Sequence, residues 1–157
     1  MKLLSKGAIV LVSVMASSFA FASQPAKNLK HAQKSAQLRQ SVFSLIGSNM
    51  KPIGGMLKGK IAFDAVRVEK SALRINQLSL MIADYMKTDT SAHKVETEAL
   101  DVVWQKQAKF AEKIEALTMA SAKLQKVAAT KDEKATKGAM KNVGRACGSC
   151  HDDFKAE

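Results

Sequence analysis

Aromatic side chains are scarce in this chain of 157 residues, where Phe, Trp and Tyr together make up only 5%. Strands favour aromatic and β-branched residues, whereas Ala, Lys, Leu and Met, which are abundant here, favour helices. Two prolines and eight glycines exclude collagen-like and proline-rich repeats. Two cysteines are too few for a disulfide-dense scaffold. The remaining class is a helical protein of one domain, with an ordinary hydrophobic content of 46%.

The first 22 residues have the pattern of a secretory signal peptide. Lys2 and Lys6 precede an apolar run from Gly7 to Phe19, and Ala20-Phe21-Ala22 places small residues before a cleavage point. The run is shorter than the roughly 20 residues that a membrane span needs. We therefore expect cleavage after Ala22, a domain of residues 23–157 in the periplasm, and no membrane insertion of the mature chain.

Four stretches with helical periodicity follow the leader. The first is expected from Asn28 towards Met50, where Pro52 and Gly54-Gly55 kink or end it. The others are expected at 64–85, with Asp64 as N-cap, at 97–129, and from Thr130 or Asp132 to the C-terminus. The polar segment 87–94 is expected to be a loop. Four amphipathic helices with short connections predict an all-α fold, an antiparallel four-helix bundle.

The most informative motif is Cys147-Gly148-Ser149-Cys150-His151. At about 100° per residue on a helix, Cys150 falls about 60° to one side of Cys147 and His151 about 40° to the other. Two thiols and an imidazole on one face suit the covalent attachment of haem c through two thioether bonds, with His151 as the axial iron ligand. Only six residues follow His151, so any group on the other side of the haem must come from earlier in the chain.

Three other interpretations of the two cysteines compete with haem attachment. A thioredoxin-like redox pair needs a βαβ context, which an all-helical chain lacks. A zinc site usually needs four ligands, and outside the motif only His31, His93 and carboxylates remain. A disulfide is possible in an exported protein but would link two residues of one helical turn.

Arg39 is expected on the inward side of the first helix, four residues before Phe43. Arginine is rarely buried unless its charge is paired, and a haem propionate would supply the anion. The alternative is that its side chain reaches the bundle edge. Gln40 is a weaker candidate for contact with the same haem edge.

Basic residues recur on the last helix at steps of three and four. Such a stripe is either a solvated face or a docking surface for acidic redox partners. Nucleic acid is a poor candidate for an exported chain without a recognition motif. The stripe consists of Lys131, Lys134, Lys137, Lys141 and Arg145.

With these features the chain resembles the cytochromes c′, the class II cytochromes c. The haem motif lies near the C-terminus, and the segment 39–47 looks like that family's first helix. The segment 58–65 resembles its turn into the second helix, and Val143-Gly144 fits its last helix. The resemblance covers nearly all of residues 28–157.

The resemblance implies a left-handed bundle, one covalent haem and a homodimer. High-spin members have five-coordinate iron with an apolar distal pocket and bind nitric oxide or carbon monoxide. Phe43 stands where low-spin relatives place a methionine ligand, so the iron is expected to be high-spin with Phe43 in the distal pocket. Lys155 aligns where some members have an arginine near the axial histidine.

The motif and the resemblance are compatible with two classes of function. One is a periplasmic haem protein that sequesters or carries nitric oxide, and the other is an electron carrier with no role in gas binding. An enzyme such as a peroxidase is not expected, because no distal His or Arg is available for acid–base work on peroxide. A dimer is also expected from the excess of apolar residues on the second helix, Leu73 and Leu80 among them.

Overall fold

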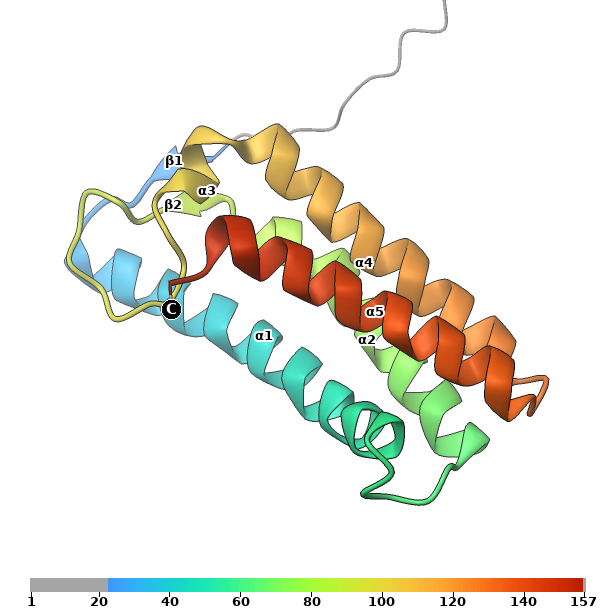
Figure 1. The fold of residues 1–157 in the computed structure, drawn as a ribbon. Helices are drawn as coiled ribbons and strands as arrows, with labels where there is room; N and C mark the ends of the chain where they lie inside the picture. The colour runs from blue at the N-terminus through green and yellow to red at the C-terminus, as the bar shows by residue number, and fades with distance from the viewer. Residues whose placement is uncertain (1–22, 157) are drawn as a thin grey trace, which may run out of the picture.

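The computed structural model describes residues 23–156, and the expected signal peptide lies outside them. Four long helices, α1 (Leu29–Leu57), α2 (Ala65–Tyr85), α4 (Gln107–Ala128) and α5 (Glu133–Phe154), run antiparallel as a bundle (Figure 1). A short helix α3 (Val102–Gln105) and two strands, β1 (Gln24–Pro25) and β2 (Thr88–Asp89), lie at one end. The predicted antiparallel four-helix bundle is confirmed.

Three of the long helices begin where short polar side chains cap them. The side-chain oxygens of Asn28, Asp64 and Asp132 accept hydrogen bonds from backbone N–H groups three residues later, at 2.9, 3.0 and 2.9 Å. An extended N-cap residue with an oxygen-bearing side chain satisfies a donor that the helix itself leaves unpaired. The predicted helix starts near these residues are therefore confirmed.

The end of α1 differs from the prediction. The helix continues through Pro52 and Gly54-Gly55 to Leu57. Ile53 is fully buried and Met56 is 2% exposed, so the last turns contribute to the core. Burial of two large apolar side chains outweighs the one helical hydrogen bond that a proline removes.

The prediction of a helix at 97–129 was wrong over its first residues. Residues 97–101 belong to a loop, and a break at Lys106 separates α3 from α4. The loop instead bonds to the end of α5: Leu100 N–H donates to the Phe154 carbonyl at 3.0 Å, and Ala156 N–H donates to the Glu98 carbonyl at 2.8 Å. These long-range bonds replace the helical bonds that the segment would otherwise form.

The connection of residues 87–101 passes beside the N-terminal segment and the start of α1 (Figure 1). β1 pairs with β2 in parallel, Gln24 opposite Thr88 and Pro25 opposite Asp89. On the other side the loop meets α1, whose first half lies at the same end of the bundle as the last turns of α5. Residues 23–28, the loop and the cysteine motif therefore lie at the same end of the bundle.

A single apolar core runs between the four long helices. Within residues 23–156, no helix is both long and apolar enough to cross a membrane. At the motif end, the rings of Phe110 and Phe154 meet edge to face with centroids 5.0 Å apart, which fixes α4 against α5. The fully buried large side chains of the core are Ile53, Val68, Ile75, Met86, Val103, Leu124, Met140 and Val143.

Candidate functional site

The cysteine motif occupies the last turns of α5. Cys147 and Cys150 are half-buried free thiols that pack against the core, and His151 is exposed. The three-residue spacing places both thiols near the buried face of the helix, and the next residue is rotated by about 100° to its flank. The expected arrangement of two thiols and one imidazole on adjoining parts of one helix is present.

Burial disfavours the ionised form of both thiols. Burial raises the pKa of Cys147. Burial also raises the pKa of Cys150 to about 11, although the nearby ammonium of Lys113 acts in the opposite direction. Redox-active Cys-x-x-Cys pairs and nucleophilic cysteines have lowered pKa values, because the thiolate is the reactive form. The environment here therefore favours unreactive thiols over a redox-active pair.

A cluster of charges fixes α5 to α4 beside the motif. Asp153 accepts from Lys109 Nζ at 2.6 Å and pairs with Lys113 Nζ at 3.0 Å, and Lys113 also donates to Ser149 Oγ. Hydrogen bonds from both lysines lower the pKa of Asp153. This cluster was not among the predicted site residues, and its only signal in the sequence is two lysines four residues apart on the neighbouring helix.

This cluster also shows which way the imidazole of His151 points. Ser149 lies on the α4 side of α5, and a residue two positions later is about 160° away around a helix. His151 therefore lies on the side of α5 turned away from α4, which is the side of α1. α5 packs mainly on α4, whereas α1 packs mainly on α2. Few direct contacts join α1 to α5.

Arg39 enters the loop 87–101 from α1 and is only 3% exposed. Its guanidinium donates to the Thr88 carbonyl at 3.1 Å and to Thr90 Oγ1 at 2.8 Å, and lies 5.1 Å from the ring centre of Trp104. Burial lowers the pKa of Arg39, and the negative charge of Asp89 opposes the shift. The arginine is thus buried as expected, and its direct partners are a carbonyl, a hydroxyl and an indole ring.

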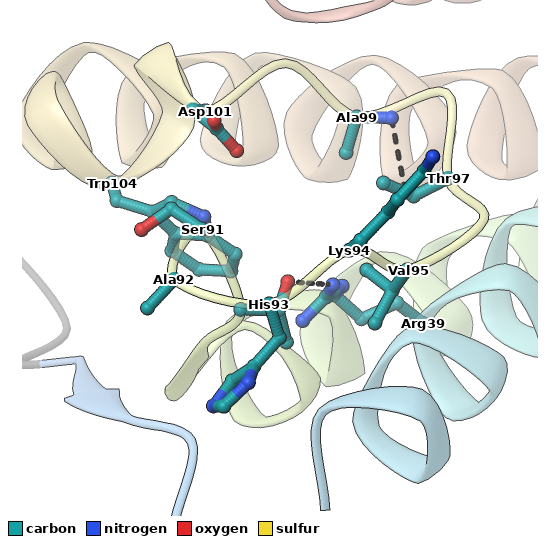
Figure 2. Close-up of a pocket in the computed structure, with 11 residues that line it drawn as sticks. Arg39, Ser91, Ala92, His93, Lys94, Val95, Thr97, Ala99, Asp101 and Trp104 are labelled. Carbon is teal, nitrogen blue, oxygen red and sulfur yellow. Dashed lines mark hydrogen bonds between the residues drawn. The ribbon is translucent and has the colours of Figure 1, made fainter. Parts of the chain in front are cut away.

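Figure 2 shows Arg39 inside a pocket formed by the loop. The pocket measures about 360 Å³, and its described lining residues include Arg39 and Lys94 together with one acidic residue, Asp101. The ring of His93, also in the lining, hydrogen-bonds to the Ala26 carbonyl. A guanidinium has five N–H donors, of which two are used here. The pocket therefore suits a carboxylate.

Gln40 and Phe43 lie on the same side of α1. Gln40 donates to the Glu96 carbonyl at 2.7 Å, so it holds the loop rather than a buried partner. Phe43 is 40% exposed, whereas Ala36, Arg39 and Ile46 are buried. The expectation that Phe43 shares the inward stripe needs correction: its ring lies at the edge of the buried face.

These residues fit a flat apolar group with acidic substituents. Two thiols and an imidazole are available on α5, and an aromatic ring on α1 exposes apolar surface that such a group would cover. Cationic donors for carboxylates lie at the same end of the bundle. Haem c has this chemistry.

Comparisons with known proteins agree with this fit. The family profile described as Cytochrome C' matches residues 34–155. A cytochrome c-554 of Cereibacter sphaeroides is 29% identical over 92% of this chain and 96% of its own length. A cytochrome c' of Rhodopseudomonas palustris is 34% identical over 76% of this chain and 80% of its own.

A solved structure has the same architecture. Cytochrome c prime from Shewanella frigidimarina superposes with a TM-score of 0.75 at 33% identity, covering 83% of this chain and all of that chain.

Proposed function

The chain belongs to the cytochrome c′ family, and from this premise we propose that it is a periplasmic haem protein that binds nitric oxide or carbon monoxide and exchanges single electrons. Its cofactor is haem c, one per chain and covalently attached. When bound, haem supplies an iron that accepts a diatomic gas and passes one electron at a time. The remaining roles belong to the residues of this chain.

Cys147 and Cys150 hold the cofactor in this proposal. The two sulfurs would hold haem through thioether bonds to its former vinyl groups, and His151, one residue after Cys150, would supply an imidazole nitrogen to the iron. The observation that carries the proposal is the placement of these three side chains on adjoining parts of the last turns of α5, with the imidazole on the α1 side.

Arg39 and Gln40 organise the propionate end of the site. Arg39 retains unused donors in a pocket of basic character, which supports a charge-assisted bond to a propionate. Gln40 fixes the loop edge through the Glu96 carbonyl. Their positions support contact with the carboxylates of the cofactor.

Phe43 defines the gas-binding side. Its ring has no lone pair for iron and no hydrogen-bond donor, so it favours ligands that need no donor, such as nitric oxide and carbon monoxide. A cytochrome c prime of Alcaligenes xylosoxidans was solved as a nitric oxide complex. At 23% identity and a TM-score of 0.70 it shares the fold, so gas binding here rests on the aromatic, donor-free character of Phe43.

An electron carrier with no gas-binding role is the second candidate. The observation in its favour is the set of exposed basic residues on α5, Lys134, Lys141 and Arg145, since charged surfaces steer redox partners. Of the predicted stripe, Lys131 lies before α5, and Lys137 is half-buried and paired with Glu133. Peroxidase activity is not proposed, because Phe43 supplies no acid or base on the gas-binding side. Export to the periplasm rests on the leader pattern of residues 1–22.

Two measurements test the proposal. Haem that resists extraction by acidified organic solvent in the natural protein, and becomes extractable after Cys147→Ala and Cys150→Ala, supports covalent attachment. Absorption spectra of the ferrous protein with and without each gas then separate the two candidates. A ferrous spectrum unchanged by carbon monoxide and nitric oxide contradicts gas binding and favours the electron carrier.

A further inference from the structure

The exposed side of α5 that precedes the haem motif is a surface of one charge. We propose that this α5 basic face, made of Lys134, Lys141 and Arg145, docks an acidic electron-transfer protein beside the haem attachment site. The inference rests on the proposed function, because it gives that haem a route for electrons. All three side chains are exposed.

The three cations have no carboxylate partner among residues 23–156. The ion pairs of the described chain engage Lys87, Lys109, Lys113, Lys137 and Lys155 instead. Lys137, on the same helix, is paired with Glu133 at 2.7 Å. Arg145 is held from the side by the Asn142 carboxamide, a neutral group. The charge of the α5 basic face is therefore available to a partner.

The spacing of these residues forms one row that ends at the motif. Steps of seven and four lead from Lys134 to Lys141 and Arg145, and three more residues lead to Gly148. One turn of an α-helix contains 3.6 residues, so steps of three, four and seven residues return to nearly the same side. These positions therefore share one side of α5 over about 21 Å. Relative to Lys134, His151 lies about 100° around the helix, so it flanks the row near the end that Gly148 forms.

Gly148 leaves the end of this row bare. A Cβ at Gly148 would meet no atom within 4 Å, so no packing contact in the structure requires glycine there. Glycine inside a helix is destabilising relative to alanine. Bare backbone between Cys147 and Ser149 lets the surface of a partner come close to the point where the cofactor is attached.

Asp152 sets the boundary of the face. This exposed carboxylate lies four residues after Gly148 on the same side of the helix. An acidic partner is attracted by Lys134, Lys141 and Arg145 and repelled at Asp152, so its contact is centred on the three cations, which end six residues before His151. Complementary charge of this kind raises association rates and loses its effect as salt increases.

The test uses the haem-loaded protein in its ferrous state and an acidic plastocyanin in its Cu(II) state. One electron passes from the ferrous iron, which becomes ferric, to copper, which becomes Cu(I). The variant is Lys141→Gln with Arg145→Gln. The control is Lys70→Gln with Arg74→Gln, which removes the same charge from exposed residues of α2, a helix that packs on α1 and α4 rather than on α5.

The α5 variant is expected to lower the second-order rate constant at low salt by about fivefold, and to flatten its dependence on ionic strength. The α2 control is expected to change the same second-order rate constant by a factor less than about one third as large. With the cationic oxidant tris(phenanthroline)cobalt(III), the α5 variant should react faster than the natural protein. An equal loss in both variants, or a loss only in the control, overturns the proposal.

The outcome is separable from failure of the proposed function. Both variants must carry covalent haem, and both must show the carbon monoxide spectrum of the natural protein, before any rate is compared. Absence of haem contradicts the proposed function, whereas normal haem with rates unaffected by the α5 substitutions contradicts only the docking surface.

Discussion

At the scale of single residues, the role proposed for Phe43 is to select which ligands the haem accepts. Its ring lies at the edge of the buried face of α1 and is 40% exposed, so it has room to move. A ring that must shift before a gas enters adds to the barrier of binding. Because the ring of Phe43 lies at the edge of the buried face of α1, its movement would control gas entry without a change in the rest of the bundle.

Phe43→Ala is therefore expected to speed carbon monoxide binding by about tenfold, which corresponds to about 1.4 kcal/mol of barrier. Flash photolysis of the ferrous complex measures the rate. Phe43→Met offers a thioether in place of a ring and is expected to give a six-coordinate low-spin spectrum. Leu45→Ala, at an exposed residue of the same helix, serves as the control, and unchanged kinetics in Phe43→Ala would remove Phe43 from the gas-binding side.

Arg39 acts at the same scale on the loop 87–101. Arg39→Leu removes bonds to Thr88 and Thr90 and leaves their oxygens without the charged donor, so we expect the free energy of unfolding to fall by about 2–3 kcal/mol. Urea denaturation measures this. Amide hydrogen exchange should accelerate in residues 87–101, while exchange in α4 keeps its natural rate if the effect is local.

At the scale of elements, α4 and α5 are joined by the cluster around Asp153. Its lowered folded-state pKa means that the pair stabilises the protein above the pKa of the unfolded chain, and that this stability is lost as pH falls through the folded-state value. Asp153→Asn is therefore expected to be less stable than the natural protein at pH 7, with a difference that shrinks below about pH 4.

Thermal unfolding as a function of pH checks this prediction. Asp84→Asn is the matched control, because its pair with Lys87 is exposed and lies within one short segment, three residues apart. A stability difference for Asp153→Asn that is independent of pH would show that the carboxylate contributes through packing rather than charge.

The elements also show what the sequence could and could not predict. Helix starts were predictable because Asn28, Asp64 and Asp132 act on their own next turn. The motif was predictable because its three side chains share one helix. The partners of Arg39 were not, since Thr88 and Thr90 lie 49 and 51 residues away. The β1–β2 pair has two residues per strand, too few to create a periodicity.

At the scale of the whole molecule, charge is distributed unevenly along the chain. The formal net charge is +11, and removal of Lys2 and Lys6 with the leader lowers it to +9. No Asp or Glu occurs before Asp64, so α1 has no acidic residue. A strongly basic surface keeps copies of the protein apart at low salt, which any dimer must overcome with apolar contacts.

α2 offers such contacts on its outer side. Val66, Leu73 and Leu80 are spaced seven residues apart and are 65%, 38% and 63% exposed. Seven residues are close to two turns, so the three side chains form one apolar stripe. We expect a homodimer that buries this stripe, because a second copy presents the same self-complementary surface. Since the stripe is apolar and the net charge repulsive, the dimer should tighten as salt increases.

Sedimentation equilibrium at micromolar concentration tests this prediction. Leu73→Lys with Leu80→Lys places two like charges on each copy at the contact and is expected to give a monomer with normal haem spectra. Met119→Lys, at an equally exposed position on α4, should leave the natural oligomeric state unchanged. A natural protein that is a monomer at every salt concentration contradicts the predicted homodimer. The stripe on α2, which is exposed rather than buried within the bundle, then has no second copy as its partner.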